Sequence, residues 1–474
     1  MQTKDNSVFC IPAGLGMLSP MSVGIALFCE RNNMELEEWK ESKGCDLKNY
    51  AHFDKRVSIN DRWSYISNPK KISQHSFYPF IHYKQNFNKF NKLKGKKTKE
   101  RDICYSAHID RCIYQYYSFL INEEYNKRVI QDGINNVAVA YRNELGKNNI
   151  HFAKEMFDFI KAGYCRDIII GDFTDFFDTL NHKYLKERLC DLLKVKELKG
   201  DYYAVYKNIT KYSKWELKEL LSLNGLKDTV KDKRELNKKY KVISFTVFKR
   251  LKKSSCCKNT CDYGIPQGSA ISAALSNVYM LEFDKKITDY IEQNNGKYMR
   301  YSDDFIIVLP HKESEEFKKH YDFIFEAIGK IPNLKLQADK TQVYNYENGE
   351  LWDQNLETGS GNEKTNPEKV SLSYLGFTFD GSEITIRDKT ISKYYYRLYR
   401  KIKATVKQIE SGKKVSCKKI YLKYSEKGAY VKEGRHIGNF ITYVDRAKKD
   451  FGQKEPIDRG TKNHMYKIKK HLNK

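Results

Sequence analysis

Apolar runs, polar turns and amphipathic stretches alternate along this chain in a pattern that predicts a mixed α+β protein. Residues 168–170 are a short apolar run that ends at Asp172, which is typical of a buried strand. The stretches 301–309 and 371–379 carry runs of the same kind and predict two further strands. A helix should follow the first strand, because leucines recur at helical spacing, namely Leu185, Leu189 and Leu192.

The same pattern divides the chain into stretches of different character. Residues 1–100 are irregular and polar and end in a basic run, so we interpret them as an extension. Residues 101–165 are denser and include a predicted strand, turn and helix. Residues 166–380 hold the three predicted strands, interrupted at about 194–260 by a lysine-rich stretch that we interpret as an insertion. Residues 381–474 are helical and basic.

The C-terminal stretch contains a long amphipathic helix. Its apolar face is formed by Tyr395, Leu398, Tyr399, Ile402, Val406 and Ile409. Its other faces carry Arg397, Arg400, Lys401, Lys403 and Lys407. Packing against a core explains the apolar stripe alone, so we interpret the basic faces as a nucleic-acid-binding surface.

The charge of the whole chain supports that interpretation. Its 86 basic and 60 acidic residues give a net charge of +26, which suits a polyanionic partner. Aromatic residues make up 14% of the chain and include 35 tyrosines. Basic side chains bind phosphates and aromatic rings stack on bases, so this composition favours nucleic acid over an anionic membrane.

Cysteine usage and the N-terminal stretch predict a soluble, cytoplasmic protein. The 11 cysteines are scattered and odd in number, which indicates reduced thiols. Cys256, Cys257 and Cys261 lack a second cysteine or histidine pair, so a zinc site is disfavoured. The apolar stretch 11–30 is broken by prolines and glycines, and we expect no membrane segment there.

Adjacent carboxylates at positions 303 and 304 carry the chemistry. A hairpin whose tight turn holds Ser302 and Asp303 would place Asp303 and Asp304 at a strand end, where burial is costly without a cation. Asp172 ends another strand, and strand ends of one sheet can be neighbours. Three carboxylates at one edge suit Mg²⁺. Two such ions about 3.5–4 Å apart support phosphoryl transfer.

Five blocks, in this order, resemble those of a reverse transcriptase with a right-hand palm. They are "DFTDFFD", "GIPQGSAIS", "YSDDF", "LQADKTQVY" and "YLGFTF", all within residues 166–380. The resemblance implies an α+β right-hand polymerase, with fingers and palm built on an RRM-like antiparallel sheet plus helices. Residues 101–165 would be the fingers, 166–380 the palm and 381–474 a helical thumb.

The resemblance also implies roles for single residues. Catalysis and two Mg²⁺ ions fall to Asp172, Asp303 and Asp304, and Phe173 joins the metal-binding set. Phe177 would wall off the ribose 2′ carbon, while its neighbour Phe176 is the expected core residue. The other nucleotide-binding candidates are Arg142, with Lys147 or Lys154 as alternatives, Gln267 and Lys340. The primer grip would be Leu375 and Gly376, and the thumb contacts would be Arg397, Arg400 and Lys401.

The expected activity is RNA-directed DNA polymerisation from deoxynucleoside triphosphates, with an RNA template and a DNA product. The insertion, the N-terminal extension and the divergent fingers resemble bacterial defence reverse transcriptases of the abortive-infection kind. That likeness implies an antiviral role, homo-oligomers, and a dedicated noncoding RNA or priming by the protein itself. The tyrosines clustered at 114–119 and 393–400 would offer a priming hydroxyl, or they stack on bases or pack the core. One alternative is a retron or group II intron-derived enzyme, and another is a non-catalytic RNA-binding protein.

Overall fold

The computed structural model describes residues 35–91, 95–337, 341–354, 369–432 and 435–472. These form two units. The first comprises the described residues of 35–117, 199–260 and 267–270, and the second those of 118–198, 261–266 and 271–472. The stretch 11–30 and Lys340 lie outside the described residues. Within the described part of the chain, no helix is long and apolar enough to cross a membrane.

The first unit is built on a four-stranded sheet. Its strand order is β2 (Gly95–Tyr105), β1 (Phe80–Asn91), β4 (Ser213–Glu216) and β5 (Cys256–Lys258), with β1 and β4 parallel and the other pairs antiparallel. Trp215 of β4 is fully buried beside Ile81 and Phe248. The helices of this unit are η1 (Asn60–Arg62), α2 (Trp63–Ile66), α3 (Pro69–Ser73), α8 (Gly200–Thr210), α9 (Leu217–Ser222), α10 (Val230–Lys238) and α11 (Phe245–Ser255).

This sheet differs from the expectation for two stretches. Residues 80–91, expected to belong to an irregular extension, form the long strand β1. Residues 213–216 and 256–258, expected in an insertion, add two strands beside it. Polar, lysine-rich strands carry little periodic signal, and β1 pairs with β4 across more than a hundred residues. No local pattern could show that pairing.

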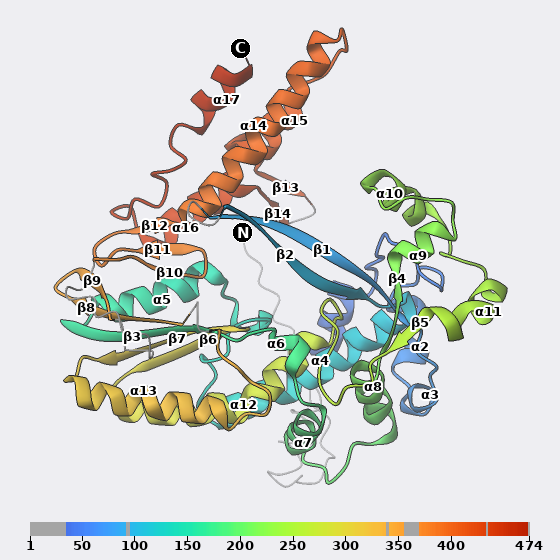
Figure 1. Ribbon diagram of the computed structural model, residues 1–474, viewed down its shortest axis with the longest axis horizontal. Coiled ribbons are helices and arrows are strands. Elements are labelled where there is room, and N and C mark those ends of the chain that lie inside the picture. The colour runs from blue at the N-terminus through green and yellow to red at the C-terminus, as the bar shows by residue number, and fades with distance from the viewer. Residues whose placement is uncertain (1–34, 92–94, 338–340, 355–368, 433–434, 473–474) are drawn as a thin grey trace, which may run out of the picture. The chain divides into compact units, whose positions relative to one another are not determined.

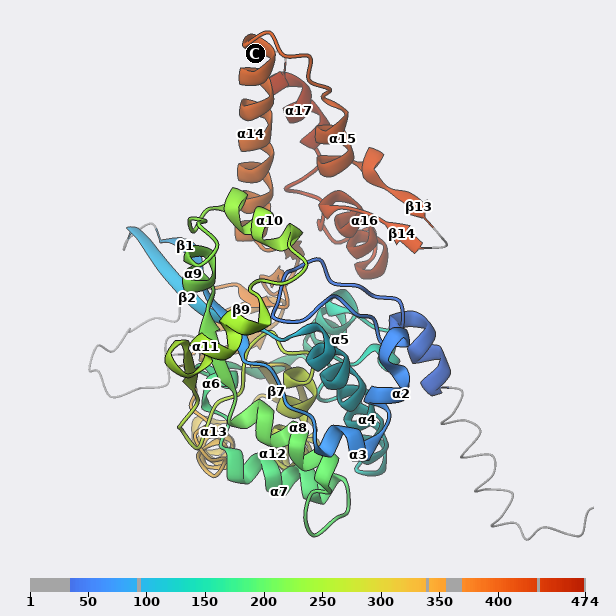
Figure 2. The ribbon, with the colours of Figure 1, turned by 90° about the vertical axis from the view of Figure 1, so that its right-hand side faces the viewer.

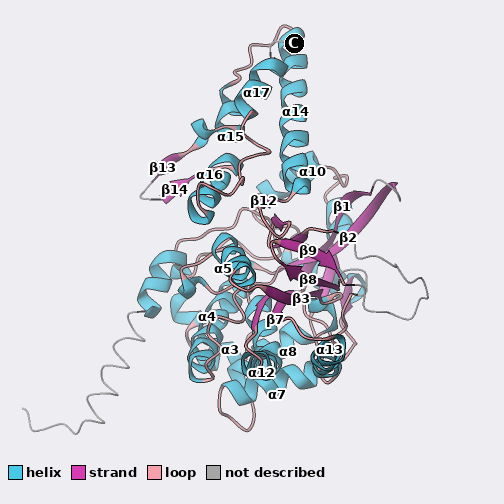
Figure 3. Cartoon of the chain, turned by 90° about the vertical axis from the view of Figure 1, so that its left-hand side faces the viewer, coloured by secondary structure: helices cyan, strands magenta, loops and turns pink. Residues whose placement is uncertain are grey.

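The second unit contains the predicted antiparallel sheet. Its order is β6 (Lys297–Tyr301), β7 (Asp304–Pro310), β3 (Cys165–Asp172), β8 (Gln342–Glu347) and β9 (Glu350–Asp353), and every neighbouring pair is antiparallel. Figure 3 shows β7, β3, β8 and β9 side by side. The apolar run of β3 is buried along its length, as expected of a strand covered on both faces.

Helices cover both faces of this sheet. Helix α5 (Asn149–Lys161) lies on one face, and α12 (Ser272–Gln293) and α13 (Ser314–Gly329) lie on the other (Figure 1). Met156 and Phe157 of α5 join Ile168 and Ile306 of the sheet in one core. The remaining elements before β10 are α4 (His108–Gln131), which runs from the first unit into the second, η2 (Asn143–Leu145), α6 (Phe176–Thr179) and α7 (His182–Leu192).

A small sheet and a helical region complete the second unit. The sheet is a meander of β10 (Leu372–Tyr374), β11 (Phe377–Phe379) and β12 (Ile384–Ile386). The predicted amphipathic helix is α14 (Asp388–Glu410), and its apolar side packs on Ile420, Tyr424 and Ile468. These residues belong to the helical region shown at the top of Figure 2. The other elements are α15 (Lys418–Tyr424), η4 (Glu426–Gly428), β13 (Tyr430–Lys432), β14 (Arg435–Ile437), α16 (Phe440–Phe451) and α17 (His464–Leu472).

Candidate active site

The predicted hairpin turn is present between β6 and β7. Tyr301 ends β6 and Asp304 begins β7, so Ser302 and Asp303 are the two turn residues. Ser302 has φ of 63°, a left-handed conformation that a residue with a side chain adopts only when its surroundings hold it there. The turn therefore places the two adjacent carboxylates at a strand end, as the sequence predicts.

Asp172 meets this turn across the sheet. It is the register partner of Asp304 between β3 and β7, and the Phe173 amide donates a hydrogen bond to the Asp303 carbonyl at 3.1 Å. Residues opposite each other in an antiparallel pair present their side chains on the same face. Asp172 and Asp304 thus continue the row formed by Ile170 and Ile306 beyond the edge of the core.

The donor set fits a hard divalent cation in its chemistry. Asp172 and Asp303 are half-buried and Asp304 is exposed, and carboxylates are oxygen ligands of the kind that Mg²⁺ prefers. Among the described residues, no three His, Cys, Asp or Glu side chains converge closely enough to enclose an ion. Phe173 is buried, which leaves its main chain as the part that could bind metal. The metal-binding assignment of these residues stays a prediction.

Phe176 and Phe177 lie in the short helix α6. Phe176 is buried and stacks on Phe173, with ring centroids 5.9 Å apart, which places it in the core as predicted. Phe177 is half-buried, and its carbonyl accepts from the Ile265 amide at 2.9 Å. A Cβ at Gly264 would lie 2.9 Å from the Asp178 carbonyl oxygen, so glycine permits this close approach.

Gln267 belongs to the first unit. Its carbonyl accepts from the Cys104 amide at 2.8 Å, and a Cβ on the following Gly268 would lie 2.6 Å from the Cys104 carbonyl oxygen. Gly268 also lines a pocket of about 380 Å³. The other walls of this pocket, which we call the tyrosine pocket, are Tyr50, Tyr83, Ile103, Cys104, Tyr105, Leu217, Lys233, Leu236 and Asn237.

Arg142 is placed differently from its expected role. Its side chain is 1% exposed, and its Nε donates to Glu144 at 2.6 Å. Its Nη atoms donate to the carbonyl and the side chain of Asn135 at 2.5 and 2.7 Å. The guanidinium therefore holds the loop before α5 together, and clamping a triphosphate would require it to leave these partners. Of the alternatives, Lys147 pairs with Glu155 at 3.1 Å and Lys154 pairs with Asp158.

The predicted primer grip is a two-residue turn between β10 and β11. Leu375 and Gly376 have φ of 46° and 96°, the pattern of a tight hairpin with left-handed turn residues. The Leu375 carbonyl accepts from the Asn149 side chain at 3.0 Å, and Asn149 also donates to the Tyr443 hydroxyl at 2.9 Å. The turn is thus fixed to α5 and α16.

The three predicted thumb residues lie together. Arg397, Arg400 and Lys401 of α14 line a groove of about 860 Å³, which we call the thumb groove. Its other residues are Thr390, Lys393, Tyr394, Ala404, Lys423, Tyr424, Gly438, Asn439 and Phe440. Five basic and three aromatic side chains in one groove, with no acidic residue in its lining, suit a phosphate backbone with bases.

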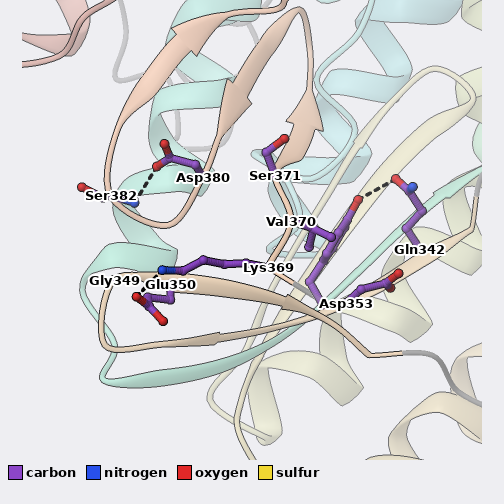
Figure 4. Close-up of a pocket in the computed structure, with 10 residues that line it drawn as sticks. Gln342, Gly349, Glu350, Asp353, Lys369, Val370, Ser371, Asp380 and Ser382 are labelled. Carbon is purple, nitrogen blue, oxygen red and sulfur yellow. Dashed lines mark hydrogen bonds and ion pairs between the residues drawn. The ribbon is translucent and has the colours of Figure 1, made fainter. Parts of the chain in front are cut away.

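A further hollow of about 770 Å³ contains none of the predicted site residues. It lies at β8 and β9, where Lys369 forms an ion pair with Glu350 and the Asp380 side chain accepts from the Ser382 amide at 2.9 Å (Figure 4). Glu350 and Asp380 are occupied by these local contacts, and we assign the hollow no role.

Two tyrosine clusters were candidates for a priming hydroxyl. Tyr114 and Tyr117 are at most 2% exposed, and Tyr394 and Tyr395 are at most 9% exposed, so these four belong to the core. Tyr396 is 63% exposed. The clusters therefore arise mainly from packing.

Sequence reasoning missed two side chains that reach the Ser302 turn. Arg300 donates from Nη1 to the Ser302 carbonyl at 2.9 Å, and the Tyr141 hydroxyl is hydrogen-bonded to Ser302 Oγ at 2.9 Å. An arginine inside an otherwise apolar strand was the available signal for the first. Nothing in the local pattern marks Tyr141, which comes from a loop far away in the sequence.

Comparison with known proteins identifies the family. Residues 125–379, more than half of the chain, match the family model described as "Reverse transcriptase (RNA-dependent DNA polymerase)". The chain belongs to the reverse transcriptase family. The matched residues include β3 and β7, which carry Asp172 and Asp304, and also the Ser302 turn and the Leu375 turn. No curated protein matches the chain.

Solved structures of telomerases are similar to the chain at low identity. The apo telomerase of Candida tropicalis truncated from its C-terminal domain is 14% identical, with a TM-score of 0.40, over 70% of this chain and 61% of that one. The telomerase of Candida albicans in complex with a fragment of telomeric RNA is 11% identical, with a TM-score of 0.38, over 86% and 65%. The chain spans less than two thirds of each of these telomerases.

Proposed function

We propose that this protein is an RNA-directed DNA polymerase that adds deoxynucleotides by phosphoryl transfer. The observation that carries the proposal is the pairing of Asp172 with Asp304 beside the Asp303 turn, in a chain of the reverse transcriptase family. Asp172, Asp303 and Asp304 would hold two divalent ions, with Mg²⁺ as the expected metal. When bound, such ions lower the pKa of the attacking hydroxyl and stabilise charge on the leaving oxygen.

The chain's own residues would select and hold the substrates. Phe177 is exposed enough to meet a sugar, and its rigid ring would clash with a 2′-hydroxyl. The thumb groove offers cations to the phosphates of a template–product duplex. In the tyrosine pocket, the Tyr50 and Tyr105 ring centroids are 5.0 Å apart and the Lys233 ammonium lies 5.9 Å from the Tyr83 ring, which suits an unpaired base of the template.

Primer extension tests the proposal. The purified protein is given an RNA template, a DNA primer, the four deoxynucleoside triphosphates and Mg²⁺, and the primer is resolved on a denaturing gel. We expect extended product that disappears with EDTA and with Asp303→Ala. A folded protein that binds the duplex and never extends it would favour the alternative, a non-catalytic RNA-binding protein.

We also propose that the activity serves antiviral defence in bacteria, with a dedicated noncoding RNA as template. The support is the insertion at 194–260 and the divergent fingers, which resemble those of defence enzymes rather than of retrons or group II introns. Phage plating on a bacterial host tests it. The wild-type chain should lower plaque counts and Asp303→Ala should restore them, whereas equal counts would contradict the defence role without touching the polymerase assignment.

A further inference from the structure

Arg300 is a charged residue in the interior of the second unit. It lies on β6, one residue before the Y-x-D-D block, and both Arg300 and Asp284 of α12 are 0% exposed. Burying a guanidinium is strongly unfavourable unless each of its donors finds a partner. A buried charged residue of this kind is therefore expected to have a specific role at its position.

Asp284 supplies the main partner. The Arg300 Nε and Nη2 atoms donate to the two Asp284 carboxylate oxygens at 2.8 and 2.5 Å, a bidentate pair. The Tyr298 hydroxyl donates to the same carboxylate at 2.8 Å. Burial alone would lower the pKa of Arg300, but the Asp284 charge raises it well above its usual range, so the guanidinium stays charged.

The remaining Arg300 nitrogen connects this pair to the catalytic turn. Nη1 donates to the Ser302 carbonyl at 2.9 Å, and Ser302 is the turn residue with φ of 63°. A left-handed conformation is unfavourable for a residue with a side chain. A hydrogen bond from a charged donor is stronger than one between neutral groups, and it can offset that cost.

A second contact holds the other side of the same residue. The Tyr141 hydroxyl and Ser302 Oγ are 2.9 Å apart. The loop that carries Tyr141 is itself tied to β6, because the Arg300 amide donates to Val137 and the Arg300 carbonyl accepts from Val139, at 2.8 and 3.0 Å. Ser302 is therefore held at its carbonyl by Arg300 and at its hydroxyl by Tyr141.

We propose that Arg300, oriented by Asp284, is the positioning residue that sets the Ser302 turn and thereby fixes where Asp303 and Asp304 stand relative to Asp172. The proposal rests on the function proposed for these aspartates. Arg300 touches no substrate. It acts through the Ser302 carbonyl, while Tyr141, in the loop before α5, holds the Ser302 hydroxyl. We call Arg300 and Tyr141 together the Ser302 clamp.

Arg300→Lys separates this role from simple stability. A lysine keeps a positive charge for Asp284, but its single ammonium cannot span both the carboxylate and the Ser302 carbonyl. Tyr141→Phe removes only a hydroxyl from a residue that is 47% exposed, so it should fold even if the lysine variant does not. Asp167→Asn is the matched control, because Asp167 is 1% exposed and accepts from His311 and the Lys312 amide at the far end of the same sheet.

Hydrogen exchange and Mn²⁺ binding test the proposal directly, and steady-state kinetics give a third measurement. Hydrogen exchange of a peptide covering residues 299–306 should become at least fivefold faster in Arg300→Lys and Tyr141→Phe, and stay unchanged in Asp167→Asn. The Mn²⁺ concentration that half-saturates binding, followed by electron paramagnetic resonance, should rise severalfold in the first two variants only. Where incorporation is measured, kcat should fall at least tenfold in Arg300→Lys while the KM for primer–template stays the same.

The outcomes separate this inference from the proposed function. If both variants lose stability like Asp167→Asn while exchange and Mn²⁺ binding match the wild type, the clamp is overturned. If exchange and Mn²⁺ binding change as expected and the wild-type protein never extends a primer, the clamp stands and the polymerase assignment fails.

Discussion

Asp172 and Asp304 stand opposite each other on neighbouring strands, and the Phe173 amide bonds to the Asp303 carbonyl one step further along. This register puts carboxylates from β3 and β7 on one face at the end of the core. A slip of one residue would turn Asp304 to the other face, together with the apolar side chains of β7. The buried row of Ile168, Ile170, Ile306 and Val308 therefore fixes the site as well as the fold.

Asp303→Ala should leave the fold intact and abolish most deoxynucleotide incorporation. Losing one metal carboxylate removes several kcal/mol of transition-state stabilisation, at about tenfold in rate per 1.4 kcal/mol. Asp172→Ala should behave alike, and Asp304→Ala should lose less, because we expect Asp172 and Asp303 to contact both ions and Asp304 to contact one. The rate of single-nucleotide addition measures the effect, with the thermal midpoint as a check on folding.

Asp322→Ala is the control for that series. It makes the same substitution at an exposed position of α13 in the same unit. Its rate should equal that of the wild type. Near-normal incorporation by a folded Asp303→Ala protein would remove the carboxylates from the mechanism.

Phe177→Val should admit ribonucleotides. The half-buried ring is the candidate barrier at the ribose 2′ carbon, and a smaller side chain opens that space. The ratio of ribo- to deoxynucleotide incorporation should rise at least tenfold. The neighbouring Phe176→Val changes a buried ring instead, so it should cost stability, on the order of 2–4 kcal/mol, with the ratio unchanged. An active Phe177→Val enzyme with the wild-type ratio would place the barrier elsewhere.

Charge reversal in the thumb groove should weaken binding to an RNA–DNA duplex. Replacing Arg397, Arg400 and Lys401 by Glu removes cations that release counterions on binding, so affinity should fall at least tenfold at 0.1 M salt and the salt slope should flatten. The matched control reverses the same number of exposed charges outside the groove, at Lys413, Lys414 and Lys418. Equal losses in the two triple variants would mean that only net charge matters.

Much of the sheet that carries Asp172 and Asp304 could be predicted from sequence because its signals are local. The apolar run ending at Asp172 and the Ser302 turn both follow from short patterns, and the structure has them where expected. The burial of Arg142 could not be predicted from a local pattern, because it depends on hydrogen bonds to Asn135 and Glu144 that form only in the folded loop. The strand that 213–216 adds to the first sheet depends on a pairing that no window of residues contains. Long-range contacts decided each of these cases.

His52 makes the stability of the protein depend on pH. It is 0% exposed in the first unit, and burial, with a smaller effect of His108, lowers its pKa to about 3. In the unfolded chain the pKa is about 6.5. Between these values the unfolded state binds a proton that the folded state does not, so stability increases with pH. The contribution of the neutral His52 to stability is fully present above about pH 6.5 and is lost progressively as the pH falls toward 3.

The expected loss between pH 7 and pH 5 is on the order of 2 kcal/mol from this residue alone. Urea unfolding at pH 7, 6 and 5 measures it, through the change in the free energy of unfolding. His52→Gln has no proton to gain, so its stability should decline less steeply over that range, whatever its stability at pH 7. Because burial also lowers the pKa of the neighbouring His108, some decline should remain in the variant. Identical slopes in the two proteins would show that His52 takes up its proton in the folded state as readily as in the unfolded chain.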